Sequence, residues 1–398
     1  MACASAPRAP ATGGGPKPEL ADIVRVHGDN VRRVKALATV QRRALRAIET
    51  CRTAALGGHR ETCDRCGATR AVYHSCRNRH CPKCQTLAKE RWIQDRRAEL
   101  LPVPYFHVVF TLPHALNRLA QHEPRVIYHL LFQAAAETLQ TFARDPQHLG
   151  GDLGITAILH TWGQNLSQHI HLHCLVTGGA LAPEGARWIP SHPHFLFPVR
   201  ALSKVFRAKY LDALQQAFDQ RQLPTEPHDP DLLPTLRRRP WVVYAKQPFA
   251  APEQVLQYLG RYTHRIALSN DRIVDFRDGV VRFRWRDSAD GHQSKVMTLP
   301  AEELLCRFLL HVLPSGFMRI RHFGLLANRH RKQKLQRCRA LLGQPPPPEP
   351  AQETAHAMVK RLTGLDLSVC PFCQKGTMRI TATLTPGDPS PVPILDTS

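Results

Sequence analysis

A run of three alternating histidines constrains the fold of this chain more than any other sequence feature. In QHIHLHCLVTGG, His169, His171 and His173 alternate with apolar residues. Because successive side chains of a strand point to opposite faces, the three imidazoles project from one face while the apolar residues point into a core. A single core histidine is ordinarily a hydrogen-bonded packing residue, whereas three in register indicate a metal site. Neighbouring imidazoles with open coordination positions suit Mg²⁺ or Mn²⁺.

Apolar periodicity indicates that strands and helices alternate irregularly along the chain. β-branched and aromatic runs predict strands at 104–113, 155–162, 169–179 and 237–246, and a hairpin at 271–288 with Asp278-Gly279 in its turn. Helical spacing predicts helices at 21–53, 85–100, 125–143, 203–220 and 252–265, with Ser203 as the expected cap of the fourth. Because regular βαβ units are few, we expect an α+β fold with a central antiparallel sheet.

The densest cysteine cluster contains two CxxC pairs, Cys63 with Cys66 and Cys81 with Cys84, separated by 14 residues. Each pair can present two thiolates to one tetrahedral ion, so this spacing predicts a four-cysteine zinc ribbon rather than a set of free buried thiols. A closed four-ligand site leaves no position for substrate, which makes the predicted role structural. Further potential ligands allow a second zinc, namely Cys76, His80, His59 and Cys51.

A third CxxC pair, Cys370 with Cys373, stands near the end of the sequence. One such pair cannot close a tetrahedral site by itself. Cys338 or His330 are the candidates to complete it, so the pair predicts a possible second zinc site.

The charge balance favours a polyanionic partner. The chain has 54 Lys and Arg against 32 Asp and Glu, a formal net charge of +22. Each DNA phosphate that a cation neutralises releases counterions, so nucleic acid is the expected partner; a merely solubilising surface is the alternative. The arginines expected to contact DNA lie among the cysteines and in the basic run 319–339: Arg65, Arg70, Arg77, Arg79, Arg319, Arg321, Arg329 and Arg331.

The sequence lacks the features of a membrane or secreted protein. Residues 1–19 contain no apolar run, and no stretch approaches the ~20 apolar residues that a membrane span needs. We therefore expect a cytoplasmic protein, associated with the bacterial nucleoid, whose cysteines bind metal instead of forming a disulfide framework.

Two tyrosines four residues apart, Tyr258 and Tyr262, lie on one face of the helix predicted at 252–265. Arg261 and Arg265 flank them as further candidate DNA contacts. On periodicity alone, a partly buried aromatic stripe beside a basic face is the simpler interpretation. A tyrosine is a poor nucleophile without a base, cation or metal, but the histidine strand upstream could supply that help.

Several of these motifs together resemble a known family. His171-Leu172-His173 on an apolar strand, YFHVVFTLPHAL, and tyrosines on a downstream helix are similar to the HUH endonucleases. Taken with the cysteine segment, YLGRYTHRIALSN and RIRHFGLLANRHR, the chain resembles, from about residue 20 to residue 340, the two-tyrosine rolling-circle transposases of the insertion sequence ninety-one family.

This resemblance implies a function. His171 and His173 would bind the catalytic metal, and Tyr258 and Tyr262 would attack DNA phosphates in turn, forming 5′-phosphotyrosines and freeing 3′-hydroxyls. The substrates would be single-stranded transposon ends and target DNA. A third ligand in such sites is usually Glu, Gln or His, and Gln164 and His169 are the two candidates.

Two alternatives remain. A plasmid or phage replication initiator or relaxase would use the same chemistry, although the zinc ribbon and the basic segment favour a transposase. A non-catalytic zinc-dependent DNA-binding regulator would explain the charge and the cysteines but would leave the histidine strand and the tyrosine pair without a role.

The combined patterns divide the chain into five segments. We expect disorder at 1–20, a helical and zinc-binding DNA-binding domain at 21–100, and an HUH-type catalytic domain with the central antiparallel sheet at 101–290. A basic helical region is expected at 291–344, followed by a Pro-rich linker and tail with its CxxC at 345–398.

Overall fold

A central antiparallel sheet organises the molecule. The computed structural model describes residues 17–223, 230–249, 254–255, 258, 260, 266–287, 290–291, 293–346 and 353–388. The sheet has the strand order β11-β4-β5-β3-β7, and a short strand, β6 (Trp188–Pro190), pairs with β5 off this path. The five strands are β3 (Tyr105–Thr111), β4 (Asp152–Trp162), β5 (Gln168–Leu181), β7 (Val243–Phe249) and β11 (Ile320–Gly324). The expected α+β fold with a central antiparallel sheet is confirmed.

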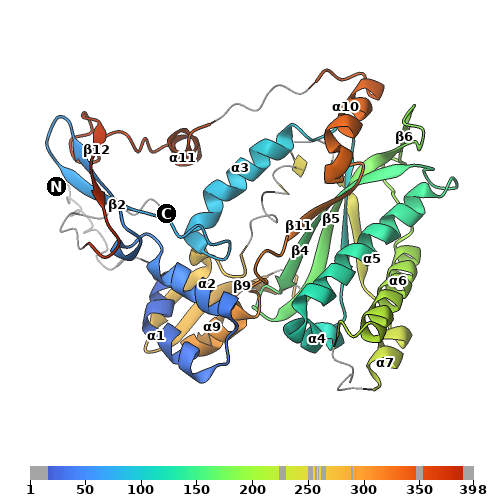
Figure 1. Cartoon of the computed structure of the whole chain (residues 1–398), viewed down its shortest axis with the longest axis horizontal. Helices are drawn as coiled ribbons and strands as arrows, with labels where there is room; N and C mark the ends of the chain where they lie inside the picture. The colour runs from blue at the N-terminus through green and yellow to red at the C-terminus, as the bar shows by residue number, and fades with distance from the viewer. Residues whose placement is uncertain are drawn as a thin grey trace, which may run out of the picture.

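The histidines of β5 point away from one face of this sheet, because their apolar neighbours pack there, and that face is covered by helices (Figure 1). These helices are α4 (Asn117–His122), α5 (Pro124–Arg144), α6 (Val199–Asp219) and α7 (Leu232–Arg238). The apolar residues that alternate with the histidines, Ile170, Leu172 and Cys174, are fully buried in this core. Burying one such side chain stabilises the fold by about 1.5–3 kcal/mol, so the alternation fixes which face of β5 turns inward.

Two predicted element boundaries were wrong. Helix α6 begins at Val199, four residues before the expected cap Ser203, whose hydroxyl donates to the Trp241 carbonyl at 2.6 Å. The strand predicted at 237–246 begins only at Val243, because residues up to Arg238 belong to α7. Both Leu232 and Leu236 are buried one helical turn apart, so packing of this leucine pair favours helix there.

The N-terminal helices share a second core with a segment more than 200 residues away. The single helix predicted at 21–53 is divided into α1 (Leu20–Val34) and α2 (Thr39–Thr50). Their apolar faces pack against the sheet of β8 (Ile273–Arg277), β9 (Val280–Asp287) and β10 (Gln293–Pro300), and against α9 (Ala301–Leu309). The predicted hairpin is confirmed, and Asp278 and Gly279 in its turn have φ values of 51° and 73°. Such positive values are those of a type I′ turn.

A third, small sheet joins segments from near the two ends of the chain. Its order is β12-β1-β2, from β12 (Met378–Leu384), β1 (Gly58–Cys63) and β2 (Thr69–Tyr73). Figure 1 shows the red β12 beside this blue hairpin, with α11 (Ala355–Thr363) nearby. The segment 345–398 is therefore more than a linker and tail. Likewise, the region 291–344, expected to be helical, contains strands β10 and β11 as well as α9 and α10 (Arg331–Leu341).

Helix α3 (Gln85–Arg97) leads from the cysteine cluster toward the central sheet (Figure 1). Among the described residues, every helix is too short or too polar to span a lipid bilayer.

Candidate functional site

The strand register gathers three histidines on the face of the central sheet that α4 to α7 leave uncovered. His160 on β4 lies directly opposite His171 on β5, and His173 is two residues further along the same strand. One ligand nitrogen from each of the three lies within 4.8 Å of the others. His171 and His173 thus share a face, as the alternation predicted. Three imidazoles at this spacing can coordinate one metal ion.

Hydrogen bonding fixes the tautomer of His171. Its Nδ1 lies 2.9 Å from the backbone carbonyl oxygen of His169. A carbonyl oxygen only accepts, so Nδ1 must carry the proton and Nε2 keeps its lone pair. That is the form of a metal-binding imidazole, oriented by a hydrogen bond from its other nitrogen.

His107 on β3 connects the histidines to a tyrosine. Its Nε2 lies 2.9 Å from Nδ1 of His173 and 2.6 Å from the hydroxyl of Tyr258. Burial lowers the pKa of His107 to about 3, so the ring is neutral at neutral pH. The sequence analysis did not single out His107. His107 can be recognised as a site residue only when the pairing of β3 with β5 is known. That pairing places His107 opposite Leu175, on the same face of the sheet as His171 and His173.

Of the tyrosine pair, Tyr258 lies in the described part of the chain. Its backbone is helical, its ring packs 4.8 Å from that of Phe249, and its hydroxyl points at His107. The structure therefore brings Tyr258 to the histidine face. Tyr262, Arg261 and Arg265 lie outside the described residues.

The third member of the histidine group is His160, neither of the two candidates named from the sequence. The ring of His169 lies 4.9 Å from that of His171 and 5.5 Å from that of His114, and His169 is outside the group of three. Gln164 lies in the connection between β4 and β5, where its backbone carbonyl accepts a hydrogen bond from Arg272. His160 stands within the strand predicted at 155–162, but only the pairing of β4 with β5 reveals its proximity to His171.

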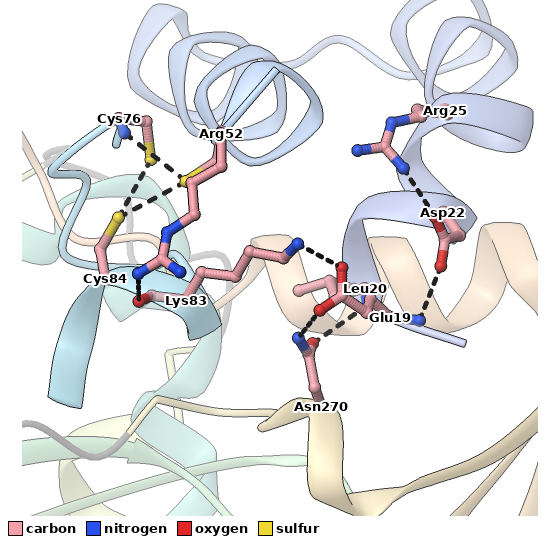
Figure 2. Close-up of polar contacts among 10 residues, drawn as sticks. Glu19, Leu20, Asp22, Arg25, Arg52, Cys76, Lys83, Cys84 and Asn270 are labelled. Carbon is pink, nitrogen blue, oxygen red and sulfur yellow. Dashed lines mark hydrogen bonds and ion pairs between the residues drawn. The ribbon is translucent and has the colours of Figure 1, made fainter. Parts of the chain in front are cut away.

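Four cysteines near the start of the chain form a tetrahedral cluster. Cys51 directly follows α2, and Cys76, Cys81 and Cys84 follow the small hairpin of β1 and β2. Sγ of Cys84 lies 3.6 Å from Sγ of both Cys51 and Cys76, and all four sulfurs lie within 4.8 Å of one another. Figure 2 shows Cys76 and Cys84 pointing toward each other. A Zn–S bond of about 2.3 Å gives a tetrahedron with edges of about 3.8 Å, so the cluster fits a structural zinc.

The loop that carries Cys84 is held to α1 by charged contacts. Lys83 Nζ lies 2.7 Å from Glu19, whose other carboxylate oxygen accepts a hydrogen bond from Asn270 at 3.0 Å (Figure 2). Asn270 in turn accepts from the backbone amide of Leu20 at 3.2 Å. Glu19 thus links the cysteine loop, the start of α1 and the segment before β8.

Cys63 and Cys66 belong to a different cluster, which corrects the predicted ribbon of Cys63, Cys66, Cys81 and Cys84. Their sulfurs lie within 4.8 Å of those of Cys370 and Cys373. The reason is the hairpin: Cys63 and Cys66 occupy its tip, and Cys76 to Cys84 follow its base. Strands of five or six residues, rising ~3.3 Å per residue, separate tip and base by roughly 15–20 Å, too far for one ion.

The other potential zinc ligands have different contacts. His59 pairs with Glu61 at 3.1 Å, and His80 accepts from the backbone amide of Leu313 at 3.4 Å, while burial lowers the pKa of His80 to about 3. Cys338 is a residue of α10 and is buried in an apolar cluster, and His330 precedes that helix. Neither Cys338 nor His330 belongs to a cysteine cluster of the described residues. The partners of Cys370 and Cys373 are Cys63 and Cys66, and not Cys338 or His330 as expected from the sequence.

A basic pocket of about 670 Å³ lies along β11, the edge strand of the central sheet. Among the described residues, its lining contains no acidic side chain, although Glu99 pairs with two of the lining arginines, Arg96 and Arg331. Arg321 stacks on Phe132 and Phe317. Burial lowers the pKa of Arg319 to about 10, which still leaves it charged. Six arginines line the pocket: Arg79, Arg96, Arg125, Arg319, Arg321 and Arg331. Arg329, also expected to contact DNA, is outside this lining.

Comparison with known proteins defines the class. A family described as "Transposase zinc-binding domain" matches residues 23–112, and one described as "Putative transposase" matches residues 154–334. Over 394 residues, 96% of this chain and 99% of the relative, the chain is 52% identical to "Putative transposase y4qJ" of Sinorhizobium fredii. It is 30% identical over 336 residues, 81% of this chain and 79% of the relative, to "Transposase for insertion sequence element IS801" of Pseudomonas savastanoi pv. phaseolicola.

This chain belongs to the IS91 family of transposases, and it carries that family's zinc-binding domain. No solved structure matches it significantly.

Proposed function

We propose that this transposase nicks and joins single DNA strands through 5′-phosphotyrosine intermediates, in rolling-circle transposition. The observation that carries the proposal is the contact series from the Tyr258 hydroxyl through His107 to His173, which puts a phenol oxygen beside a group of metal-binding imidazoles. A DNA-binding regulator has no use for such an arrangement.

His160, His171 and His173 would hold the divalent ion, Mg²⁺ or Mn²⁺, and three protein ligands leave coordination positions for oxygen atoms of the substrate. Bound there, the ion would polarise the scissile phosphate. Gln164 remains a candidate for a further ligand from the connection between β4 and β5.

The hydrogen bonds support a specific role for His107. When His173 uses Nε2 as a ligand, its Nδ1–H donates to Nε2 of His107, and His107 must then carry its own proton on Nδ1. The Tyr258 oxygen lies 2.9 Å from that nitrogen and 2.6 Å from Nε2, so the ring of His107 contacts the phenol and orients it. His107 is therefore a positioning residue for the nucleophile.

In the cleavage step, a new bond joins the Tyr258 oxygen to phosphorus as the bond from phosphorus to the 3′-oxygen breaks. The phenol loses its proton and the departing 3′-oxygen gains one. Because one phosphodiester replaces another, attack by a different 3′-hydroxyl on the phosphotyrosine joins strands without ATP. Tyr262 would serve as the second nucleophile, which allows two linked cleavages.

DNA binding would fall to the basic surfaces. The arginine pocket along β11 combines positive charge with the aromatic rings of Trp92 and Phe317, which suits single-stranded transposon ends and target DNA. Both structural zinc and these arginines would position DNA without entering the chemistry.

The test is covalent capture. Wild-type protein with end-labelled single-stranded DNA from the element's termini and Mn²⁺ is expected to form a denaturation-resistant adduct. Tyr258→Phe with Tyr262→Phe should remove the adduct while DNA binding stays nearly unchanged, because the lost hydroxyls are nucleophiles and not the main contacts to DNA.

Tyr73→Phe, on β2 in the small sheet, is the matched control and should retain the adduct. An adduct that survives in the double variant would show that another residue is the nucleophile. Absence of any adduct with the wild type on terminal DNA would favour the regulator, and mass spectrometry of the adduct peptide identifies the tyrosine used.

A further inference from the structure

We infer that Cys63, Cys66, Cys370 and Cys373 form a second zinc site, which fastens the C-terminal segment 353–388 to the N-terminal zinc-binding domain. Cys370 and Cys373 lie beyond both family matches, which end at residues 112 and 334. The inference stands independently of the tyrosine chemistry.

The sulfur geometry is that of a tetrahedral ion and not of disulfides. Sγ of Cys63 lies 3.7 Å from that of Cys373, and Sγ of Cys66 lies 3.7 Å from that of Cys370. These separations match the ~3.8 Å edge of a tetrahedron whose Zn–S bonds are about 2.3 Å, whereas a disulfide requires about 2.05 Å. Each CxxC pair therefore contributes two corners of one site.

The backbone around the sulfurs is arranged to support thiolates. The amides of Arg65 and Cys66 point at Sγ of Cys63, at 3.4 and 3.5 Å, and the amide of Gly376 points at Sγ of Cys373 at 3.4 Å. A Cβ at Gly376 would collide with Sγ of Cys63, so glycine alone permits this approach. Amide donors stabilise negatively charged sulfur, which a zinc site contains and a set of neutral thiols does not.

Neighbouring contacts align the two knuckles. Asp64, inside the first CxxC pair, accepts a hydrogen bond from the amide of Thr377 at 2.8 Å. The buried Arg70 pairs with Glu61 and donates to the carbonyl of Leu367 at 2.6 Å. The strand β12 then pairs with β1 from Met378 to Leu384. The C-terminal segment thus meets the hairpin in one defined register.

Apolar packing at this junction is slight. Its cluster contains Cys63, Cys370 and Met378 as buried members, with Ala68 and Cys373 packed against them. Small modules that cannot bury a sizeable core commonly depend on a structural metal. A zinc ion supplies the attachment that so few apolar side chains cannot.

The test counts zinc and follows the C-terminal segment. In the full chain, Cys370→Ser with Cys373→Ser should lower the bound zinc by one ion per chain relative to wild type, measured by elemental mass spectrometry. Cys306→Ser, a cysteine of α9 outside both clusters, is the control and should keep the wild-type count. Cys373→His retains a possible zinc ligand and should also keep it.

A protease site introduced in the Pro-rich linker at 345–350 gives a second readout. After cleavage, the segment should remain attached to the wild-type body until a strong chelator releases it. An unchanged zinc count in the double serine variant would overturn the inference. If that variant fails to fold, the cleaved wild-type protein decides: release of the segment with zinc still bound, or retention after all zinc is removed, contradicts a zinc-held attachment.

Discussion

At the scale of single residues, the site depends on which side chains the strand register places side by side. His171 and His173 come from one strand and could be predicted from their alternation. His160 comes from β4, and its place opposite His171 follows from pairing that no local pattern specifies. The pairing of β3 with β5 likewise places His107 in the site. Sequence reasoning therefore found the histidines that share a strand and missed those contributed by neighbouring strands.

This arrangement predicts a difference between two histidines. His160→Ala should weaken Mn²⁺ binding by more than the roughly 10–100-fold that loss of a ligand's hydrogen-bond partner costs, because it removes one of the three proposed ligands. His169→Ala should change it little, since the carbonyl that orients His171 belongs to the backbone and survives. Calorimetric titration with Mn²⁺ compares the two variants. A larger loss for His169→Ala would favour His169, one of the two candidates named from the sequence, as the third ligand.

At the scale of elements, the close packing of β11 against β4 depends on a glycine. Gly324 ends the strand with φ of +64°, and a Cβ there would overlap the backbone carbonyl of Leu153 and the side chain of Gln140. The side chain of Gln140 cannot move aside without losing a hydrogen bond, because its amide donates to that same carbonyl at 3.0 Å. The close approach of β11 to β4 therefore needs both the positive φ and the missing side chain.

We expect Gly324→Ala to destabilise the protein well beyond the ~1 kcal/mol that a positive φ alone costs alanine. Gly343→Ala is the matched control, because its φ is +67° but a Cβ there would meet no atom within 4 Å. Urea or thermal unfolding of the two variants separates strain from steric overlap. Equal stabilities would mean that β11 tolerates displacement from β4.

Predictability from the sequence differed between elements for a physical reason. Apolar runs and helical spacing located β3, β4, β5, α3 and α5 closely. All of these except α3, which buries only Gln85, contribute many buried side chains to a core. The break between α1 and α2, the start of α6 and the partners of the cysteines were missed. Those features depend on packing or on pairing across hundreds of residues, and the CxxC pairs themselves look alike wherever they stand.

At the scale of the whole molecule, the excess of positive charge is concentrated by the fold. The net charge of +22 follows from the composition. The basic pocket could not be predicted from the sequence, because its arginines come from separate segments around residues 79, 96, 125 and 319–331. Only the folded chain places them around one cavity.

This concentration predicts a change in salt dependence. Replacing Arg125, Arg321 and Arg331 with Gln should reduce the slope of log affinity for single-stranded DNA against log salt by about 2, at roughly 0.7 per lost phosphate contact. The control changes the same number of charges at Arg200, Arg237 and Arg238, which are exposed on α6 and α7 and lie outside the lining of the pocket. Equal slopes in the two triple variants would indicate that DNA affinity depends on the total charge of the protein and not on where the arginines lie.

The central place of β1 in the small sheet affects how the molecule is made. β2 follows β1 within a few residues, but the other neighbour, β12, is separated from it by almost the entire chain; Cys66 and Cys370 are 304 residues apart. At ~5–20 residues per second, a ribosome needs roughly 15–60 s to deliver the missing strand. Throughout that interval the nascent hairpin has one unpaired strand edge and only two of the four cysteines of its cluster. A messenger RNA truncated before codon 370 would therefore yield a polypeptide whose first domain lacks β12 and the other two cysteines.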